Sequence, residues 1–404
     1  MNFGRGFTWP SPLRETASVR VLDITEWFGE TSGGVRTYLN EKAAYVAQRS
    51  DYAQVLVVPG QEDSVSEQPG MRCYRLRGPH IPTQKPYRFM LATRSIRRII
   101  ESERPSVIEV GSCFAVPWIV KRAARASGIP LVGFFHGNLA RTVCPFPERA
   151  SAMTRRVYET TWKYMRAVYD RCDITVCASE FAAADLAAHG VERVAVVPLG
   201  VDLAHFHPRR REYACQTRES LGLPTDRRLI AFVGRFAREK EIEVLLDAWP
   251  SIEQRTDAGL VLVGDGHQRH AVDALARRSD RVYRLPYQGD REALADLLAA
   301  VDVVVSPGSA ETFGLCALES LASGTPVLAA DRGGVAEQLA KSGAGATFAS
   351  GESESLAAAA LDLLDREDLG LLGYQGRAYA EREHEWSVTF DRLFARYREV
   401  AEAA

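Results

Sequence analysis

The sequence predicts an α/β protein built from two parallel β-sheets that follow one another along the chain. Short β-branched runs alternate with helical patterns through both halves, which is typical of parallel sheets covered by helices. The pattern begins again after residue 202. A chain of 404 residues is also long enough for two domains of ordinary size.

The expected strands are the short apolar runs. They lie at residues 19–24, 54–58, 107–110, 131–135, 174–177 and 194–197, and then at 229–233, 260–263, 282–285, 303–305, 327–329 and 346–348. Helices fall between them, for example at 35–48 and 242–249. We expect a first Rossmann-like domain at 1–202, a second at 203–375, and terminal helices at 376–404. Ligands of such sheets bind beyond the carboxyl ends of the strands.

Composition excludes several classes of protein. Hydrophobic residues make up 46% and charged residues 25% of the chain, as in soluble globular proteins. No run approaches the ~18 apolar residues that cross a bilayer. Residues 1–14 contain no apolar signal core, so a cytoplasmic protein is expected. Seven cysteines without a Cys-x-x-Cys pair argue against a disulfide framework and against a zinc site.

Basic residues are concentrated in one part of the chain. Between Lys85 and Arg171, sixteen Lys or Arg stand against six Asp or Glu, although the whole chain has a net charge of −2. Aromatic residues such as Tyr87, Trp118 and Trp162 lie among them. Solvated helix faces would explain each helix by itself, but together the helices indicate an anionic partner, either a membrane surface or a charged acceptor. Nucleic acid is not expected, because the remainder is acidic and contains no nucleic-acid-binding motif.

The most informative segment runs from Glu311 to Glu319. It follows an apolar strand and the turn 306–309, and it opens a helix, whose first N–H groups favour an anion. The start of that helix contains Phe313, Gly314 and Leu315. At about 1.5 Å of rise per residue, Glu319 lies about two turns into the helix. Two carboxylates beside an anion site indicate a ligand with hydroxyls and phosphate, such as a nucleotide sugar, although two surface glutamates would have the same spacing.

The surrounding residues resemble the retaining glycosyltransferases of family 4, which have a GT-B fold. The resemblance rests on Ser306-Pro307-Gly308, Glu311-Thr312-Phe313-Gly314, residues 319–327 and Gly333-Gly334, and it extends more weakly over residues 19–386. It implies two Rossmann-like domains facing each other across a cleft, with the C-terminal helix crossing back to the first domain. It also implies that Glu311 contacts the donor sugar and that Glu319 holds the ribose. The backbone of residues 313–315 would lie against the sugar and the diphosphate.

Arg235 and Lys240 follow the first strand of the second domain. A diphosphate suits the fork of an arginine and the point charge of a lysine, although a solvated loop would contain the same residues. The resemblance assigns both cations to the donor diphosphate, with no metal and no cofactor. It also marks a departure, because the family usually has Gly where Glu241 stands. We expect this carboxylate either to tune Lys240 or to face solvent, and Arg238 and Glu239 to face solvent.

Two pairs of glycines and a histidine complete the candidate site. Gly33 and Gly34 open a helix, Gly264 and Gly266 follow a strand, and His136 ends the strand at 131–135. Tight turns and a structural histidine would explain these residues as well. The resemblance places His136 near the reacting sugar, the first pair against donor phosphate or acceptor, and the second pair near the nucleotide. The dinucleotide fingerprint, the Walker loop and the nucleophile elbow are absent from the sequence, which argues against an NAD enzyme and a Ser-His-Asp hydrolase.

The resemblance implies a retaining, metal-independent hexosyltransferase that uses GDP-mannose or a UDP-sugar. Residues 134–142 and 164–173 resemble bacterial members that act on lipids, namely mannosyltransferases of glycolipids and phosphoinositides and sulfoquinovosyltransferases of diacylglycerol. We therefore expect a membrane-lipid acceptor and peripheral docking at the inner face of the cell membrane. The alternatives are a transferase to a soluble or polysaccharide acceptor, a nucleotide-sugar epimerase, and a non-catalytic nucleotide-sugar binding protein.

Overall fold

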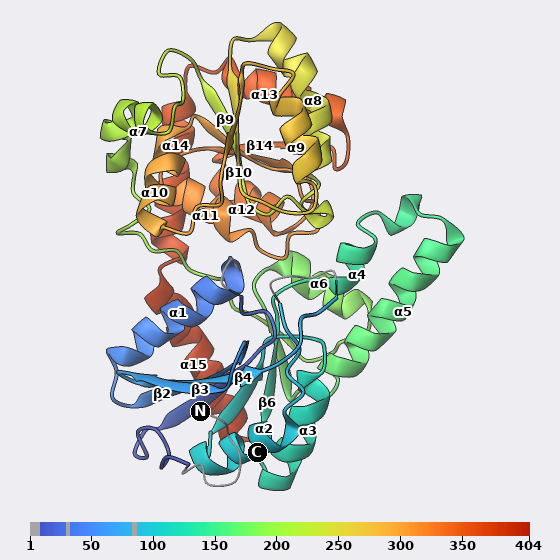
Figure 1. Cartoon of the computed structure of the whole chain (residues 1–404), viewed down its shortest axis with the longest axis vertical. Coiled ribbons are helices and arrows are strands. Elements are labelled where there is room, and N and C mark those ends of the chain that lie inside the picture. Colours follow the sequence, from blue (N-terminus) through green and yellow to red (C-terminus); the bar gives the residue numbers. More distant parts are fainter. Residues whose placement is uncertain (1–8, 30–32, 83–86) are drawn as a thin grey trace.

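The computed structural model describes residues 9–29, 33–82 and 87–404. Within these ranges the chain forms two sheets, one in each half of the molecule (Figure 1). The first is eight-stranded, in the order β3-β4-β2-β1-β5-β6-β7-β8, and the second is six-stranded, in the order β11-β10-β9-β12-β13-β14. Neighbouring strands are parallel except β3 and β4, which are antiparallel. The predicted α/β fold class is confirmed.

The strands of the first sheet are β1 (Val19–Ile24), β2 (Tyr52–Gly60), β3 (Ser64–Gln68), β4 (Met71–Arg77), β5 (Val107–Val110), β6 (Leu131–Phe135), β7 (Ile174–Cys177) and β8 (Val194–Val196). Those of the second sheet are β9 (Leu229–Val233), β10 (Gly259–Val263), β11 (Val282–Leu285), β12 (Val303–Ser306), β13 (Val327–Ala330) and β14 (Gly345–Phe348). Every strand expected from the apolar runs is present, because buried parallel strands are apolar on both faces.

The helices of the first half are α1 (Gly34–Ala47), α2 (Thr93–Glu103), α3 (Val116–Ser127), α4 (Leu139–Val143), α5 (Ala152–Tyr169) and α6 (Glu180–Ala188). Those of the second half are α7 (Ala214–Ser220), α8 (Ile242–Arg255), α9 (Arg269–Ala276), α10 (Arg291–Ala300), α11 (Leu315–Ala322), α12 (Gly334–Ser342), α13 (Ser353–Leu364), α14 (Leu369–Glu383) and α15 (Trp386–Glu402). Short 3-10 turns lie at Pro147–Arg149, Pro208–Tyr213 and Arg238–Lys240.

Two features differ from the sequence prediction. The hairpin of β3 and β4 was not predicted, because β3 is an edge strand with exposed polar residues such as Glu67 and Gln68 and so has no apolar run. Helix α8 also extends past the predicted end at residue 249 and through Pro250. Ile252 on the far side of the proline is fully buried in the core, so tertiary packing outweighs the unfavourable proline.

The C-terminal chain crosses from the second domain to the first. Helix α14 packs on α11 and α12, whereas α15 packs on α1, β1 and β5. At the crossing, Val201 of the outward segment pairs with Glu385 of the returning segment, and the Val201 N–H donates to the His384 carbonyl at 2.7 Å. The predicted return of the last helix to the first domain is therefore confirmed.

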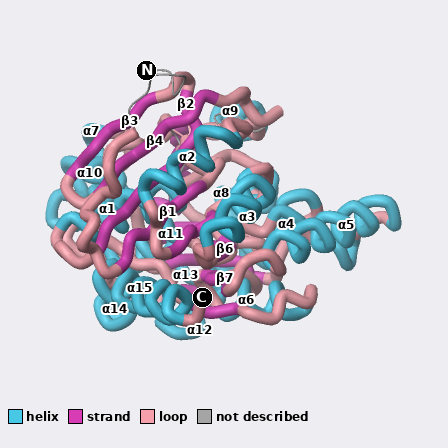
Figure 2. The backbone as a smooth tube through the Cα atoms, turned by 90° about the horizontal axis from the view of Figure 1, so that it is seen from below, coloured by secondary structure: helices cyan, strands magenta, loops and turns pink. Residues whose placement is uncertain are grey.

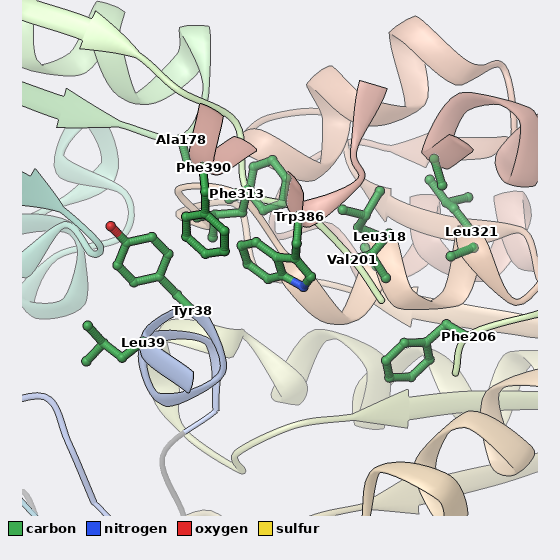
Figure 3. Close-up of a cluster of buried hydrophobic side chains, with 14 of the residues drawn as sticks. Tyr38, Leu39, Ala178, Val201, Phe206, Phe313, Leu318, Leu321, Trp386 and Phe390 are labelled. Carbon is green, nitrogen blue, oxygen red and sulfur yellow. The ribbon is translucent and has the colours of Figure 1, made fainter. Parts of the chain in front are cut away.

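A continuous apolar cluster fills this crossing. Trp386 and Phe390 stack with ring centroids 5.2 Å apart, and residues of both domains surround them (Figure 3). Tyr38 of α1 contacts the cluster from the first domain and Phe313 from the second. Burial of each large side chain contributes about 1.5–3 kcal/mol, so the cluster holds the two sheets with their carboxyl edges towards each other.

Candidate active site

The sequence-predicted residues come from loops at the carboxyl ends of strands in both sheets. Glu311 follows β12 and Arg235 follows β9, whereas His136 follows β6. The hydroxyl of Thr312 donates to the His136 carbonyl at 2.9 Å, and the Ser179 hydroxyl donates to the Thr312 carbonyl at 2.5 Å. These bonds join the two domains at the segment that carries Glu311. The structure therefore brings Glu311 and His136 together, although they lie far apart in the sequence.

Lys240 and Glu311 form an ion pair at the same place. The Lys240 ammonium donates to Oε1 of Glu311, and the two side chains are 32% and 16% exposed. Lys240 ends the 3-10 turn at Arg238–Lys240, which lies next to α4 of the first domain. The pair is thus accessible from the interface between the domains. A ligand phosphate arriving there would meet a cation whose position is set by a neighbouring carboxylate.

Arg235 also has a carboxylate partner. Its Nη2 donates to Oε1 of Glu239 at 2.6 Å, and the guanidinium remains 43% exposed. The expectation that Glu239 faces solvent is therefore wrong, since it is only 19% exposed and orients Arg235. Arg238 is exposed, as expected. The tight turn at Arg238–Lys240 brings Glu239 back towards Arg235, which local charge patterning did not reveal.

Glu241 occupies a left-handed backbone position, with φ of 49°. Such a conformation favours glycine, which explains the family's usual residue there. The expectation that its side chain faces solvent is wrong, because the carboxylate is buried and its Oε1 accepts from the Ser309 N–H at 3.0 Å and the Ser309 hydroxyl at 2.6 Å. These two bonds tie the start of α8 to the loop before Glu311 and offset the cost of the positive φ.

His136 packs against two aromatic rings. Its imidazole stacks on Phe134 with centroids 4.0 Å apart and meets the edge of Tyr38 at 5.1 Å. Burial lowers the pKa of His136 to about 3, and the ammonium of Lys42 acts in the same direction. The ring is therefore neutral near pH 7. A neutral imidazole suits hydrogen bonding to a sugar hydroxyl rather than charge stabilisation.

Glu319 lies in α11, and its side chain is buried. Burial raises the pKa of this carboxyl group to about 8; Arg291 opposes the shift, and Glu41 and Asp202 reinforce it. Phe313, Gly314 and Leu315 form the entry to the same helix. Gly314 has φ of 88°, and a Cβ atom there would lie 2.2 Å from Cγ2 of Val335. Glycine is therefore required at this position by the backbone and by packing.

The two predicted pairs of glycines have different surroundings. Gly33 and Gly34 are exposed at the start of α1, and a Cβ atom at either would meet nothing within 4 Å. Gly264 and Gly266 instead pack against backbone, because Cβ atoms there would lie 1.9 Å from the Gly234 carbonyl oxygen and 2.3 Å from the Phe236 carbonyl oxygen. The second pair thus allows the loop after β10 to support the loop that carries Arg235.

Tyr87 lies near the candidate site, and the sequence indicated it only as one aromatic residue of the basic region. Burial raises its pKa, whereas the cations of Arg235 and Lys240 act to lower it, so the phenol lies near both. Trp27 holds the Tyr87 ring edge-on, with centroids 5.0 Å apart. The first domain thus adds an aromatic side chain close to the two cations. Its position depends on the packing of the domains, so no local pattern could identify it.

The described residues contain neither a metal-binding cluster nor a membrane-spanning helix. No three His, Cys, Asp or Glu side chains of residues 9–29, 33–82 and 87–404 are grouped as a metal site requires. No helix in the same ranges has both the length and the apolar character needed to cross a membrane.

The chain resembles known proteins over most of its length. Residues 32–205 match the profile described as Glycosyltransferase Family 4, and residues 215–377 match that of Glycosyl transferases group 1. The chain is 32% identical over 368 residues to a GDP-mannose-dependent alpha-(1-6)-phosphatidylinositol dimannoside mannosyltransferase of Mycobacterium tuberculosis, which covers 87% of this chain and 89% of that protein. It is 25% identical over 319 residues to a GDP-mannose-dependent alpha-mannosyltransferase of Corynebacterium glutamicum, covering 78% of this chain and 73% of that protein.

Among solved structures, sucrose-phosphate synthase from Thermosynechococcus elongatus superposes with a TM-score of 0.80 at 22% identity, covering 95% of this chain and all of that one. This structural likeness shows the fold, whereas the sequence matches described above show the family. Both agree with the resemblance carried by the segment from Glu311 to Glu319. The chain belongs to glycosyltransferase family 4 and has the GT-B fold.

Proposed function

We propose that this glycosyltransferase moves mannose from GDP-mannose to a hydroxyl of a membrane glycolipid, with retention of anomeric configuration and without a metal ion. The observation that carries the proposal is the Lys240–Glu311 pair, joined through Thr312 to the His136 loop of the other domain. The arrangement offers a cation for the donor diphosphate and a carboxylate for the sugar, and the backbone of His136, whose imidazole is neutral, is bonded to the same segment. GDP-mannose is chosen over a UDP-sugar because the two relatives described above are named for it.

In the proposed reaction, Arg235 and Lys240 bind the diphosphate and stabilise the negative charge that develops as it departs. Glu311 and His136 hold the mannose, and Glu319 accepts hydrogen bonds from the ribose. The acceptor oxygen forms its bond to the anomeric carbon on the face from which the diphosphate leaves, and the acceptor proton passes to the departing phosphate oxygen. The chain then acts by positioning and electrostatic stabilisation, without a covalent intermediate.

The proposal of a lipid acceptor is supported by helix α5. This helix projects away from the first domain (Figures 1 and 2). Met153 and Val157 lie one turn apart on it and are 74% and 44% exposed, and the exposed Arg155 and Arg156 lie between them in the sequence. A helix that exposes both apolar side chains and cations suits an anionic bilayer surface, where each Lys or Arg contributes about 1 kcal/mol. Lys85, which opens the basic stretch, lies outside the described residues.

The test measures nucleotide release with GDP-mannose or UDP-glucose, in EDTA, with and without vesicles of phosphatidylinositol mannosides. Release that requires both GDP-mannose and vesicles, with an α-linked product by NMR, is expected. Nucleotide release that requires a water-soluble acceptor instead of vesicles would indicate a transferase to a soluble or polysaccharide acceptor. Conversion of the donor into another nucleotide sugar without any acceptor would indicate an epimerase. Binding without turnover would indicate a non-catalytic protein.

The double substitution Met153→Ser and Val157→Ser tests the role of α5. Vesicle binding is expected to weaken about tenfold, because two apolar contacts are lost, while turnover of a water-soluble acceptor analogue stays unchanged. Thr160→Ser on the same helix is the matched control. Unchanged vesicle binding by the double variant would exclude α5 from the docking surface.

Nucleotide affinity is expected to rise with pH as Glu319 loses its proton. Because burial holds its pKa at about 8, the group is mainly protonated at pH 7 and mainly ionised at pH 9. An ionised carboxylate accepts hydroxyl hydrogen bonds more strongly, so GDP should bind about fivefold more tightly at pH 9 than at pH 7. Calorimetry on wild type and Glu319→Gln separates this effect from titration of the nucleotide. An equal pH dependence in both proteins would contradict the assignment of Glu319.

A further inference from the structure

Arg291 joins the two domains beside Glu319. It is the first residue of α10 in the second domain, and its Nη1 donates to Oε1 of Glu41, in α1 of the first domain. The two side chains are 36% and 16% exposed. Figure 1 shows α1 facing α10 across the space between the sheets. This ion pair therefore exists only while α1 lies against the second domain.

The same guanidinium is the principal cation acting on Glu319. The attraction of Arg291 opposes the upward shift in the pKa of Glu319, and that of Glu319 acts to raise the pKa of Arg291. Glu41 and Asp202 also act on both residues. Glu41 and Asp202 thus both form ion pairs with this guanidinium, and the charge of Glu319 also acts on it. The direct hydrogen bond of the guanidinium goes to Glu41.

Asp202 is held by other groups. Its carboxylate lies 2.7 Å from Nδ1 of His205 and accepts from the backbone N–H groups of Ala204 and His205 at 3.1 Å, whereas Nη2 of Arg291 is 3.9 Å away. His205 in turn lies 2.9 Å from Glu292, which pairs with Arg210. The position of Asp202 is therefore fixed within the segment between the domains. Glu41 is the carboxylate that would leave Arg291 if the domains separated.

We infer that Arg291 is a positioning residue whose partner is set by the arrangement of the domains. With α1 in place, Glu41 holds the guanidinium, and the buried Glu319 carboxylate remains available to the ribose. When α1 withdraws, Arg291 turns to Glu319 and competes with the ribose hydroxyls. Binding of the nucleotide ribose and closure of the domains thereby favour each other. The inference rests on the proposed role of Glu319 and adds an interdomain control to it.

Calorimetry with GDP and with 2′,3′-dideoxy-GDP tests this inference. At pH 9, where Glu319 is mainly ionised, a hydrogen bond to this charged group contributes roughly 1.5–3 kcal/mol, so wild type should bind the dideoxy nucleotide about tenfold more weakly or worse. Glu41→Gln should weaken GDP binding about fivefold and leave dideoxy-GDP binding nearly unchanged, so that the ratio of the two dissociation constants falls from about tenfold to about twofold. In the double variant Glu41→Gln, Arg291→Gln the competing guanidinium is absent, so the ratio of the two dissociation constants should return to its wild-type value. A purely structural role would change both nucleotides equally.

Glu292→Gln is the matched control, because Glu292 is the next residue of α10 but pairs with Arg210 and His205; its ratio should equal that of wild type. Glu41→Asp, which retains the charge on a shorter side chain, serves if Glu41→Gln does not fold, and it should give an intermediate ratio. Equal binding of both nucleotides by wild type would refute the ribose role of Glu319 itself. A wild-type preference that Glu41→Gln retains in full would overturn the inference and leave that role intact.

Discussion

Replacing Lys240 with methionine is expected to lower kcat/KM for glycosyl transfer by about 100- to 1000-fold. Removing one preorganised group that stabilises developing charge in an active site typically has an effect of this size. In this chain the loss has two parts, because Lys240 is proposed to bind the departing diphosphate and also pairs with Glu311. Steady-state release of GDP from GDP-mannose measures the change.

Arg238→Met is the matched control for Lys240. It removes a cation from the same 3-10 turn, but Arg238 is exposed and is not assigned to the donor. A change of less than about threefold is expected. If Lys240→Met had an effect as small as that, the assignment of Lys240 to the diphosphate would be wrong. If Lys240→Met raised KM without lowering kcat, Lys240 would bind the donor in the ground state rather than stabilise the departing diphosphate.

Replacing Lys42 with methionine is expected to destabilise the first domain by about 3–5 kcal/mol, the usual effect of breaking a buried ion pair. Lys42 is fully buried, and its ammonium donates to Asp23 at 2.7 Å, Glu109 at 3.1 Å and the Tyr397 hydroxyl at 2.9 Å. The substitution leaves two buried carboxylates without their cation. It also removes a bond that joins α1 to α15. The urea dependence of unfolding measures the loss, with the exposed Lys163→Met as control.

The loss of folding stability caused by Lys42→Met should grow as the pH rises. Burial raises the pKa of Glu109 to about 7, whereas Lys42 acts to lower it. A carboxyl group whose pKa is higher in the folded state stabilises the fold at low pH, and this stabilisation is lost as pH rises through the folded value. Without Lys42, ionisation of Glu109 is more costly, so destabilisation should be larger at pH 8 than at pH 5.5. The same loss at both pH values would mean that Glu109 does not titrate in this range.

Most of the candidate site could be read from local sequence. Glu311, Arg235 and His136 stand directly after apolar strands, and parallel strands place such positions at one edge of each sheet. The segment up to Glu319 identified the family because its glycines and carboxylates have fixed spacing. What these residues do for the reaction remains a proposal, as do the domain boundaries near residues 203 and 375.

The two parallel sheets, the family and the position of each motif could be predicted from the sequence, since all of these depend on neighbours within one strand, turn or helix. The partners of the charged side chains became clear only once the chain was folded. Glu239 turned back to Arg235, Glu241 bonded Ser309, and Arg291 met Glu41 across the domain interface. An ion pair forms between groups within about 4 Å, whatever their separation along the chain. Such contacts depend on how helices and sheets pack, and no local pattern records them.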